Sequence, residues 1–462
     1  MRSSGTSLVK SNERRQSPGL VKVSATVTDT IAAIATPLGQ GGIGVVRLSG
    51  PEALRIGETI SATELQPRHL TRATFEDSNG EAIDEGLAVA FRSPASYTGE
   101  DVVELHAHGS PVLLAMLLER SLALGARMAK PGEFSERAFL SGKLDLVQAE
   151  AVADLIASGS KGMARAAVRS LKGEFSRRVT ALDDAIKAIR MEIEASIDFA
   201  DEAESFLEMR EIETGLAALA TQVDAVLGEA ARGAALSKGL TLVLTGAPNV
   251  GKSSLMNRLA GHERAIVSAE PGTTRDVLHQ QIELAGQQLE VVDTAGLRSA
   301  SSEVEAEGVK RAQAAIEEAD VRLDLWDASR PETRGAWPAP STGQVILEVM
   351  NKQDLVATRE TDCLAISAKD GTGCAELVKE IERQVLSARG EPTFLARARH
   401  VEALQRCQEA LKSARHEHIT TKAPELVAES LREAHTALGE IVGLTTTEDL
   451  LGEIFRNFCL GK

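Results

Sequence analysis

Gly246–Ser253, with the sequence Gly-Ala-Pro-Asn-Val-Gly-Lys-Ser, has the residue types and spacing of a phosphate-binding loop. A strand-like apolar run precedes it and a helix-like segment follows it. Gly246 and Gly251 let several backbone N–H groups point at one anion, and the helix N-terminus adds its dipole. Lys252 can reach the β- and γ-phosphates, and the hydroxyl of Ser253 can bind Mg²⁺. The pattern predicts a nucleotide site, with a chance match as the alternative.

Two segments beyond this loop carry candidate ligands for Mg²⁺ and for the γ-phosphate. Asp293-Thr-Ala-Gly296 ends a second strand-like apolar run. The carboxylate of Asp293 can hold Mg²⁺ through water, and the N–H of Gly296 can sense a γ-phosphate. Thr273 and Thr274 lie between the two motifs, where a threonine can complete the Mg²⁺ shell when the γ-phosphate is present.

The base is predicted to be guanine. Asn351-Lys-Gln-Asp354 follows another strand-like run, and the carboxylate of Asp354 can accept hydrogen bonds from N1–H and the N2 amino group of guanine. Adenine offers no such pair of donors and would leave a buried carboxylate unpaired, so GTP is favoured over ATP. Ser367-Ala-Lys369 would close over the base.

Together, these five motifs in this order and spacing predict a GTPase domain of the type found in translation factors. The residues that we assign to GTP come from the five motifs and from the segment between the first two. They are Asn249, Val250, Gly251, Lys252, Ser253, Ser254, Ser268, Thr273, Thr274, Asp293, Thr294, Ala295, Gly296, Asn351, Lys352, Asp354, Ser367, Ala368 and Lys369.

One position departs from the usual GTPase pattern. Many GTPases place a glutamine after Asp-x-x-Gly to orient the attacking water, but this chain has Leu297 there. Another group must therefore stabilise the transition state. Asn249 in the phosphate loop is a candidate ligand for a monovalent cation such as K⁺, whose charge would replace that of an arginine finger. The alternative is an ordinary loop asparagine.

The composition disfavours several classes of protein. The chain has 462 residues, a net charge of −16 and 3% aromatic residues, which disfavours a surface broadly coated for nucleic acid and a single-strand stacking platform. The four cysteines are too scattered for a disulfide framework or a zinc site, which fits a reducing compartment. Because no apolar run approaches the ~18 residues of a membrane span, we expect no membrane insertion and a cytoplasmic location.

The distribution of apolar residues divides the chain into segments. The strand-like and helix-like segments within residues 29–142 predict an α+β domain. Residues 143–238 and 391–462 repeat apolar residues at spacings of three and four, which predicts helices. The GTPase segment, 239–390, separates them, so the simplest arrangement is an α/β domain inserted into one helical bundle. For residues 1–28 we expect a disordered tail or a misassigned start, with an organellar transit peptide as the alternative.

Local charges suggest two further contacts. Lys161, Arg165, Arg169 and Lys172 share one face of a predicted helix and form the best candidate patch for RNA, although a solvated helix face has the same pattern. Arg47 lies in the middle of an apolar strand, which indicates either an anionic ligand or a structural ion pair.

Three stretches outside the GTPase motifs resemble the tRNA-modification GTPase family MnmE, also called TrmE. They are the terminal Phe458–Lys462, the opening Asp29–Pro37 and the segment Lys130–Phe139, so the resemblance covers residues 29–462. It implies an α+β N-terminal domain that binds a formylated tetrahydrofolate and forms the homodimer, a helical domain and a Ras-like GTPase domain. The terminal motif has Leu460 where the family usually has isoleucine. The role of Cys459 in this motif stays open.

The resemblance also implies ligands and partners. The family's contacts with 5-formyltetrahydrofolate fall on Arg47, Glu104, Lys143 and Lys462. Mg²⁺ would be held by Ser253 and Thr274, K⁺ by Asn249, Ser268, Glu270 and Thr273, and the attacking water by Glu305. The two GTPase domains of the dimer would close across the nucleotide. With a partner similar to the FAD-containing protein MnmG, the family adds a carboxymethylaminomethyl or aminomethyl group to the wobble uridine of certain tRNAs.

Two alternatives come from other classes of protein. An Era-like ribosome-assembly GTPase shares the central motifs, but the terminal motif argues against it. A stand-alone folate enzyme with a regulatory GTPase is the second, and residues 29–140 show no evident set of catalytic bases for it.

Overall fold

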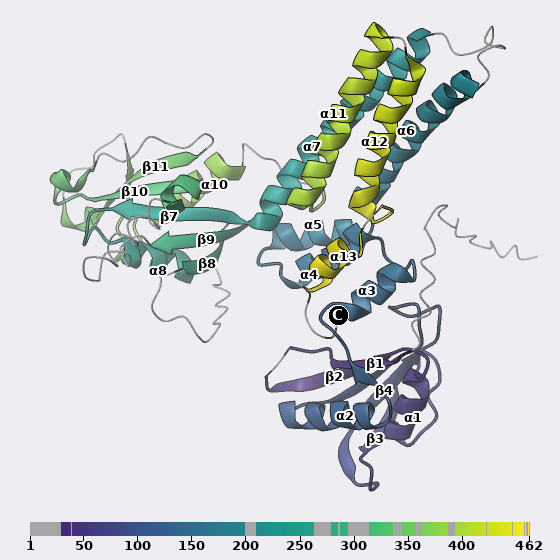
Figure 1. The fold of residues 1–462 in the computed structure, drawn as a ribbon. Helices are drawn as coiled ribbons and strands as arrows, with labels where there is room; N and C mark the ends of the chain where they lie inside the picture. Colours follow the sequence, from purple (N-terminus) through teal and green to yellow (C-terminus); the bar gives the residue numbers. More distant parts are fainter. Residues whose placement is uncertain are drawn as a thin grey trace, which may run out of the picture. The chain divides into compact units, whose positions relative to one another are not determined.

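The computed structural model describes residues 29–37, 39–198, 209–262, 279–284, 287–293, 314–335, 344–356, 363–386, 393–421, 423–445, 447–456, 458 and 461. The chain divides into two compact units (Figure 1). One combines Met1–Asp145 with Leu444–Lys462, and the other is Leu146–Gly443.

The first unit is built on a six-stranded sheet in the order β3-β4-β5-β2-β1-β6. Its pairings are antiparallel except for that of β1 with β6. The strands are β1 (Ile31–Ile34), β2 (Gly41–Ser49), β3 (Thr71–Glu76), β4 (Ala82–Phe91), β5 (Val102–Gly109) and β6 (Arg127–Met128). Helices α1 (Ala53–Ser61) and α2 (Pro111–Ala123) share one hydrophobic core with this sheet.

The side chains of β2 alternate between the face of the sheet that packs on α1 and α2 and the opposite face. Val46 and Leu48 are fully buried in the core with α1 and α2. Because successive side chains of a strand point to opposite faces, Arg47 lies on the other face. Helix α3 (Glu133–Leu140) contributes Phe134 to a smaller core on that face, together with Ile31 of β1.

The end of the chain packs on the first unit. Phe455 of α13 (Glu448–Arg456) lies with its ring centroid 6.4 Å from that of Phe139 in α3. Gly132 has φ +72°, and a Cβ there would lie 2.4 Å from the carbonyl oxygen of Phe455. By its contacts, Leu444–Lys462 groups with the first unit, where Phe455 packs on Phe139.

The second unit contains a helical part formed from both sides of the inserted segment. Its long helices lie side by side (Figure 1), and α12 contacts α6 and α11 while α11 contacts α7. The helices are α4 (Leu146–Ile156), α5 (Lys161–Leu171), α6 (Glu174–Asp198), α7 (Met209–Lys238), α11 (Ala398–Thr420) and α12 (Pro424–Val442). This arrangement confirms the predicted helical bundle.

A buried ionic cluster joins three of these helices. Glu150 of α4, which is 1% exposed, accepts hydrogen bonds of 2.8 and 2.7 Å from Nε and Nη2 of Arg399 in α11. Arg399 Nη1 also donates to the carbonyl oxygen of Glu440 in α12. The ring of His400 lies with Nε2 3.0 Å from Glu150, while its Nδ1 accepts from the backbone N–H of Arg397. The neutral ring therefore carries its proton on Nε2.

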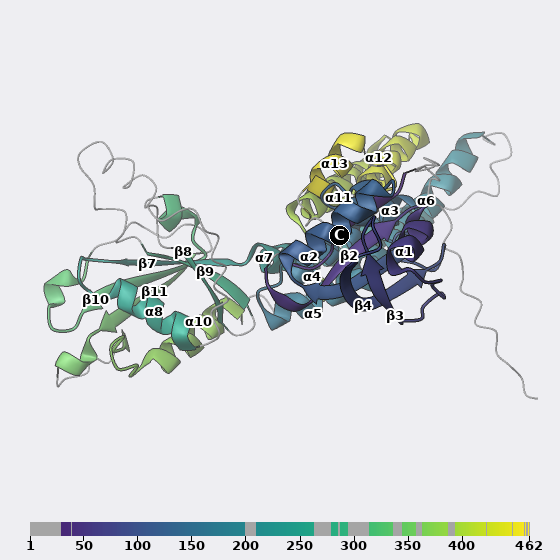
Figure 2. The same ribbon diagram turned by 90° about the horizontal axis from the view of Figure 1, so that it is seen from below.

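The same unit contains a second six-stranded sheet, in the order β12-β11-β10-β7-β9-β8. Only β8 and β9 pair antiparallel among its described pairs. The strands are β7 (Leu240–Gly246), β8 (His279–Leu284), β9 (Gln287–Asp293), β10 (Val321–Asp327), β11 (Val345–Asn351) and β12 (Leu364–Ala365). Helices α8 (Lys252–His262) and α10 (Cys374–Leu386) cover one face (Figure 2). The predicted α/β GTPase fold is confirmed.

Candidate functional site

The phosphate loop lies at the carboxyl end of β7, where ligands of open α/β sheets bind. Gly246 has φ +145° and Gly251 has φ +100°. A Cβ at Gly246 would lie 2.5 Å from the carbonyl oxygen of Leu325 in β10. Asn249 also has a positive φ, +67°, which asparagine tolerates better than most residues. The backbone therefore curls back toward the sheet before α8 begins.

Lys252, the first residue of α8, turns its side chain into this curl. Its Nζ donates to the carbonyl oxygens of Gly246 and Ala247 at 2.8 and 3.1 Å, and the residue is only 4% exposed. The ammonium group thus lies inside the loop, where the sequence pattern places the phosphates. Ser253 and Ser254 follow in the first turn of the helix and are both exposed.

Asn351 joins the phosphate loop to the loop after β12. Its Nδ2 donates to the carbonyl oxygen of Val250 at 2.7 Å, and its Oδ1 accepts from the N–H of Ala368 at 3.0 Å. The side chain is 2% exposed. A Cβ at Gly251 would lie 2.3 Å from this Nδ2, which explains a glycine there besides its positive φ. The sequence does not reveal these contacts, because they join segments that are distant along the chain.

The predicted base-recognition residues meet at the ends of β11 and β12. The hydroxyl of Ser367, which is fully buried, donates to Oδ1 of Asp354 at 2.9 Å. Arg258 of α8 donates to the carbonyl oxygens of Ala368 and Lys369 and so fixes their loop. The structure thus brings Asp354 and the Ser367–Lys369 loop together at one edge.

Lys352 forms an ion pair with a residue of the neighbouring strand β10. It has φ +63°, and its Nζ lies 2.7 Å from Oδ2 of Asp327 at the end of β10. Burial would raise the pKa of Asp327, but the hydrogen bonds from Lys352 and Ser329 outweigh it and lower that pKa. Asp327 is a residue that sequence reasoning missed. Its signal was the position of a carboxylate at the carboxyl end of a strand.

Several predicted ligands lie outside the described residues. They are Ser268, Glu270, Thr273, Thr274, Thr294, Ala295, Gly296, Glu305 and Lys462. Asp293 ends β9 as predicted for its motif, but its side chain is not described. Among the described residues, no group of three or more His, Cys, Asp or Glu side chains could hold a metal ion. The assignments of Mg²⁺, K⁺ and the catalytic glutamate therefore stay predictions.

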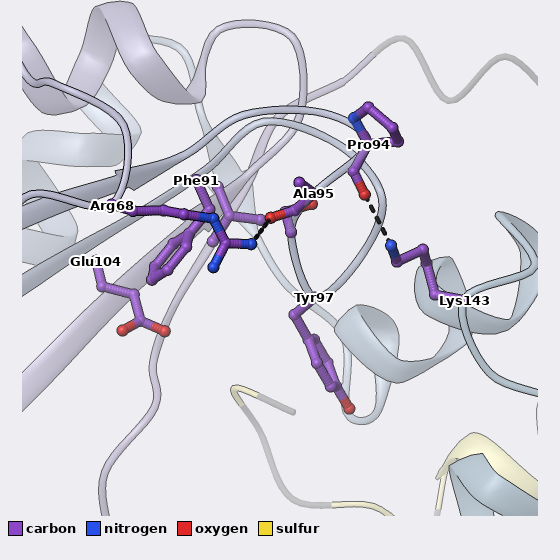
Figure 3. A pocket seen from close by; sticks show the side chains of 9 residues that line it. Arg68, Phe91, Pro94, Ala95, Tyr97, Glu104 and Lys143 are labelled. Carbon is purple, nitrogen blue, oxygen red and sulfur yellow. Dashed lines mark hydrogen bonds between the residues drawn. The ribbon is translucent and has the colours of Figure 1, made fainter. Parts of the chain in front are cut away.

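A second candidate site lies in the first unit, as a cavity of about 500 Å³ beside β4 and β5 (Figure 3). It is bounded by charged, aromatic and backbone groups, with the loop after β4 forming one wall. Its lining residues are Arg68, Phe91, Pro94, Ala95, Ser96, Tyr97, Val102, Glu104 and Lys143.

Arg47 and Glu104 form an ion pair at this cavity. They are direct partners in the register of β2 and β5, and Arg47 Nη2 lies 2.8 Å from Glu104 Oε1. Arg47 Nη1 donates to the carbonyl oxygen of Gly461 at 3.3 Å, and its guanidinium lies 5.6 Å from the centre of the Tyr97 ring. His106 approaches the other carboxylate oxygen at 3.2 Å. Arg47 is thus a paired arginine that also holds the terminal motif.

Lys143, the third predicted folate contact in the described residues, reaches the same cavity from after α3. Its Nζ donates to the carbonyl oxygen of Pro94 at 2.8 Å. Tyr97 is held from the same side, because its hydroxyl lies 2.9 Å from that of Ser135 in α3. Burial raises the pKa of Tyr97, so its hydroxyl stays protonated at neutral pH. Glu104 and Lys143 therefore line one cavity, and Arg47 is paired with the first of them.

The predicted basic face lies on α5. Lys161, Arg165 and Lys172 are exposed, whereas Arg169 is half-buried and its Nε donates to the carbonyl oxygen of Thr393. Three of the four predicted residues are thus accessible to a polyanion. None of the described helices is long and apolar enough to cross a lipid bilayer.

Comparison with known proteins gives matches along nearly all of the chain. The profile described as the MnmE helical domain matches residues 146–459, and the profile described as the GTP-binding protein TrmE N-terminus matches residues 30–143. The tRNA modification GTPase MnmE of Stutzerimonas stutzeri is 48% identical over 452 residues, which are 94% of this chain and 99% of the relative. That of Methylococcus capsulatus is 46% identical over 443 residues, with the same coverage.

Solved structures match a smaller part of the chain. The FeoB G-domain from Methanococcus jannaschii is 26% identical and covers 32% of this chain and 97% of its own, with a TM-score of 0.23. Era in complex with MgGDPNP and 16S ribosomal RNA nucleotides is 26% identical. The match covers 37% of this chain and 66% of the Era chain, with a TM-score of 0.25.

Proposed function

The chain belongs to the MnmE family of tRNA modification GTPases, and we propose that K⁺ and Mg²⁺ support its GTP hydrolysis and that a folate-derived one-carbon unit enters the tRNA modification. The proposed product is a carboxymethylaminomethyl or aminomethyl group on the wobble uridine. A homodimer, a partner similar to the FAD-containing MnmG and a cytoplasmic location complete the proposal. We also propose an N-terminal domain at 29–142, a helical domain formed by 143–238 and 391–462, and a GTPase domain at 239–390.

The observation that carries the folate part is that Glu104 lines the cavity and pairs with Arg47, which also donates to the carbonyl oxygen of Gly461. Gly461 directly precedes Lys462, the fourth proposed folate contact, so the terminal motif and the cavity belong to one structural unit. A carboxylate can accept hydrogen bonds from the N–H groups of a pterin, while cations suit the acidic tail. The lining of the cavity therefore fits a folate.

The phosphate loop supports the cation part of the proposal. Asn249 is exposed and held with a positive φ between the strand and α8, so its amide oxygen is accessible beside the phosphate position. An amide oxygen is a suitable ligand for a hard cation. K⁺ would be held by Asn249, Ser268, Glu270 and Thr273, and Mg²⁺ by Ser253 and Thr274. The positive charge of these cations would stabilise the negative charge that develops on the transferred phosphoryl group.

The test is a calorimetric titration of 5-formyltetrahydrofolate into the full chain and into a version that lacks Phe458–Lys462. We expect binding to the full chain and none to the truncated version. Because Phe458 packs on Phe455, truncation can also loosen the first unit, so Lys462→Gln and Glu104→Gln serve as milder variants. No binding to the intact, folded protein would remove the folate part and bring the ribosome-assembly alternative forward.

A further inference from the structure

Two cations at the cavity of the first unit have no acidic partner among the described residues. Arg68 donates from Nη2 to the carbonyl oxygen of Ala95 at 2.6 Å, and Lys143 donates to that of Pro94 at 2.8 Å. Both acceptors are neutral, so neither positive charge is compensated by an ion pair within the described structure. Figure 3 shows the two side chains approaching the Pro94–Tyr97 loop from different sides.

Several other arginines of this unit are paired with carboxylates. Arg47 pairs with Glu104, Arg72 with Glu85, and Arg92 with Asp101, each at 2.9 Å or less. An ion pair to a neighbouring carboxylate is thus the common arrangement here. Arg68 instead directs its charge into a cavity that it lines, which indicates a ligand with an acidic group.

The backbone and the aromatic neighbour hold Arg68 in place. Arg68 has φ +60°, a conformation that costs on the order of 1 kcal/mol for a residue with a side chain. Its guanidinium lies 5.7 Å from the centre of the Phe91 ring, within the range of a cation–π contact. With Nη2 bound to Ala95, the guanidinium is oriented before any ligand arrives, so it loses little side-chain freedom on binding.

We propose that Arg68 is a specificity-determining residue that binds a carboxylate of the ligand's acidic tail, next to Lys143. This inference rests on the proposed folate function and deepens it. In this arrangement the pterin end of the folate lies toward Glu104, which accepts N–H donors, and the glutamate tail lies toward the two cations. Arg68 then distinguishes folates that carry a glutamate tail from the corresponding pteroates that lack it.

The test is a cycle of two proteins and two ligands, measured by calorimetry at low and at physiological ionic strength. The ligands are 5-formyltetrahydrofolate and the matching 5-formyltetrahydropteroate. In the unmodified chain we expect the glutamate tail to strengthen binding roughly 10-fold, as a charge-assisted hydrogen bond at an exposed site can provide. Arg68→Gln should reduce this advantage to about 2-fold or less and leave the affinity for the pteroate unchanged.

Arg72→Gln is the matched control, because Arg72 is an exposed arginine of the same unit, is paired with Glu85 and does not line the cavity. Arg68→Lys should retain part of the tail advantage, which separates lost charge from a damaged loop. An unchanged tail advantage in Arg68→Gln would overturn the inference while leaving the folate function intact. If the intact chain binds neither ligand, the folate function itself fails, and the inference fails with it.

Discussion

The side-chain amide of Asn351 donates to the carbonyl oxygen of Val250 in the phosphate loop, while its oxygen accepts from the N–H of Ala368 in the base loop. One buried residue therefore fixes the two loops that are predicted to hold opposite ends of the nucleotide. Asn351 thus links the phosphate loop to the base loop, and we expect either loop to lose its conformation when Asn351 is removed.

Asn351→Ala should weaken the binding of GTP and GDP alike. The substitution leaves a buried N–H and a buried C=O without their partners, at a cost of about 1–3 kcal/mol each. We expect at least a 10-fold loss of affinity for both nucleotides in a fluorescence titration. Lys379→Ala, at an exposed position of α10, is the control. Full affinity for both nucleotides in Asn351→Ala would contradict the linking role.

Replacing K⁺ by Na⁺ should slow GTP hydrolysis if Asn249 helps to hold a monovalent cation. The variant Asn249→Gly removes the amide oxygen but tolerates the φ of +67°, so it avoids the strain that alanine would add. We expect this variant to hydrolyse GTP slowly and equally in both salts, in a phosphate-release assay. Equal rates in K⁺ and Na⁺ for the unmodified chain would rule out the cation role.

Glu305→Ala should lower the single-turnover rate of GTP hydrolysis by roughly 100-fold or more, as expected for a residue that positions or activates the attacking water. The affinity for GTP should stay nearly unchanged, because Glu305 is not expected to bind the nucleotide in the ground state. Glu303→Ala and Glu307→Ala, two residues away on either side, are matched controls. A normal rate of hydrolysis in Glu305→Ala would show that this residue does not position the attacking water.

The helical part should lose stability as the pH falls from about 7. Burial lowers the pKa of His400, and Glu150 offsets only part of this effect. The unfolded chain therefore binds a proton near the ordinary pKa of 6.5 more readily than the folded chain, so stability is present above that pH and lost below it. We expect the melting temperature, followed by helical circular dichroism, to fall between pH 7 and pH 5.5.

The neighbouring carboxylate adds a second step at lower pH. Burial would raise the pKa of Glu150, but its contacts with His400 and Arg399 outweigh burial and lower it. The stability that it contributes is therefore present above about pH 4.5 and lost as the pH falls further. His400→Gln should flatten the first step and also weaken the second, because the His400 ring is one of the contacts that lower the pKa of Glu150. His416→Gln, at an exposed position of the same helix, should leave both steps unchanged. If the loss of stability between pH 7 and pH 5.5 survives in His400→Gln, another group is responsible for it.

The double variant Arg165→Gln with Lys172→Gln should weaken tRNA binding and reduce its dependence on salt. Each contact with a phosphate releases counterions, so losing two contacts lowers the slope of log affinity against log salt by about 2 at most. Arg432→Gln is a control, because Arg432 is exposed but paired with Glu429. An unchanged affinity and salt slope would identify the basic face of α5 as an ordinary solvated surface.

The sequence was sufficient to predict features that depend on local patterns. The phosphate loop and its flanking strand and helix lie where predicted, because glycine positions and apolar runs encode them directly. Contacts between distant segments could not be predicted from such patterns. The pairing of Arg47 with Glu104 depends on the register of β2 and β5, which the alternation of side chains alone does not fix.

The chain end shows the same limit. No local pattern reveals where its aromatic residues pack, because the complementary surface at Phe139 and Gly132 exists only in the folded first unit. Arg68 was missed for a related reason. An arginine in a turn gives no sequence signal, and its significance comes from the cavity that the fold places beside it.

The first unit is assembled from Met1–Asp145 and Leu444–Lys462, which has a consequence for synthesis on the ribosome. The sheet with α1 and α2 emerges early, but the surface that receives Phe455 waits until Leu146–Gly443 has been translated. At a translation rate of ~5–20 residues per second, that interval is on the order of 15 to 60 s. During this time the surface at Phe139 and Gly132 stays uncovered, so the first unit completes its packing only after the second unit has been synthesised.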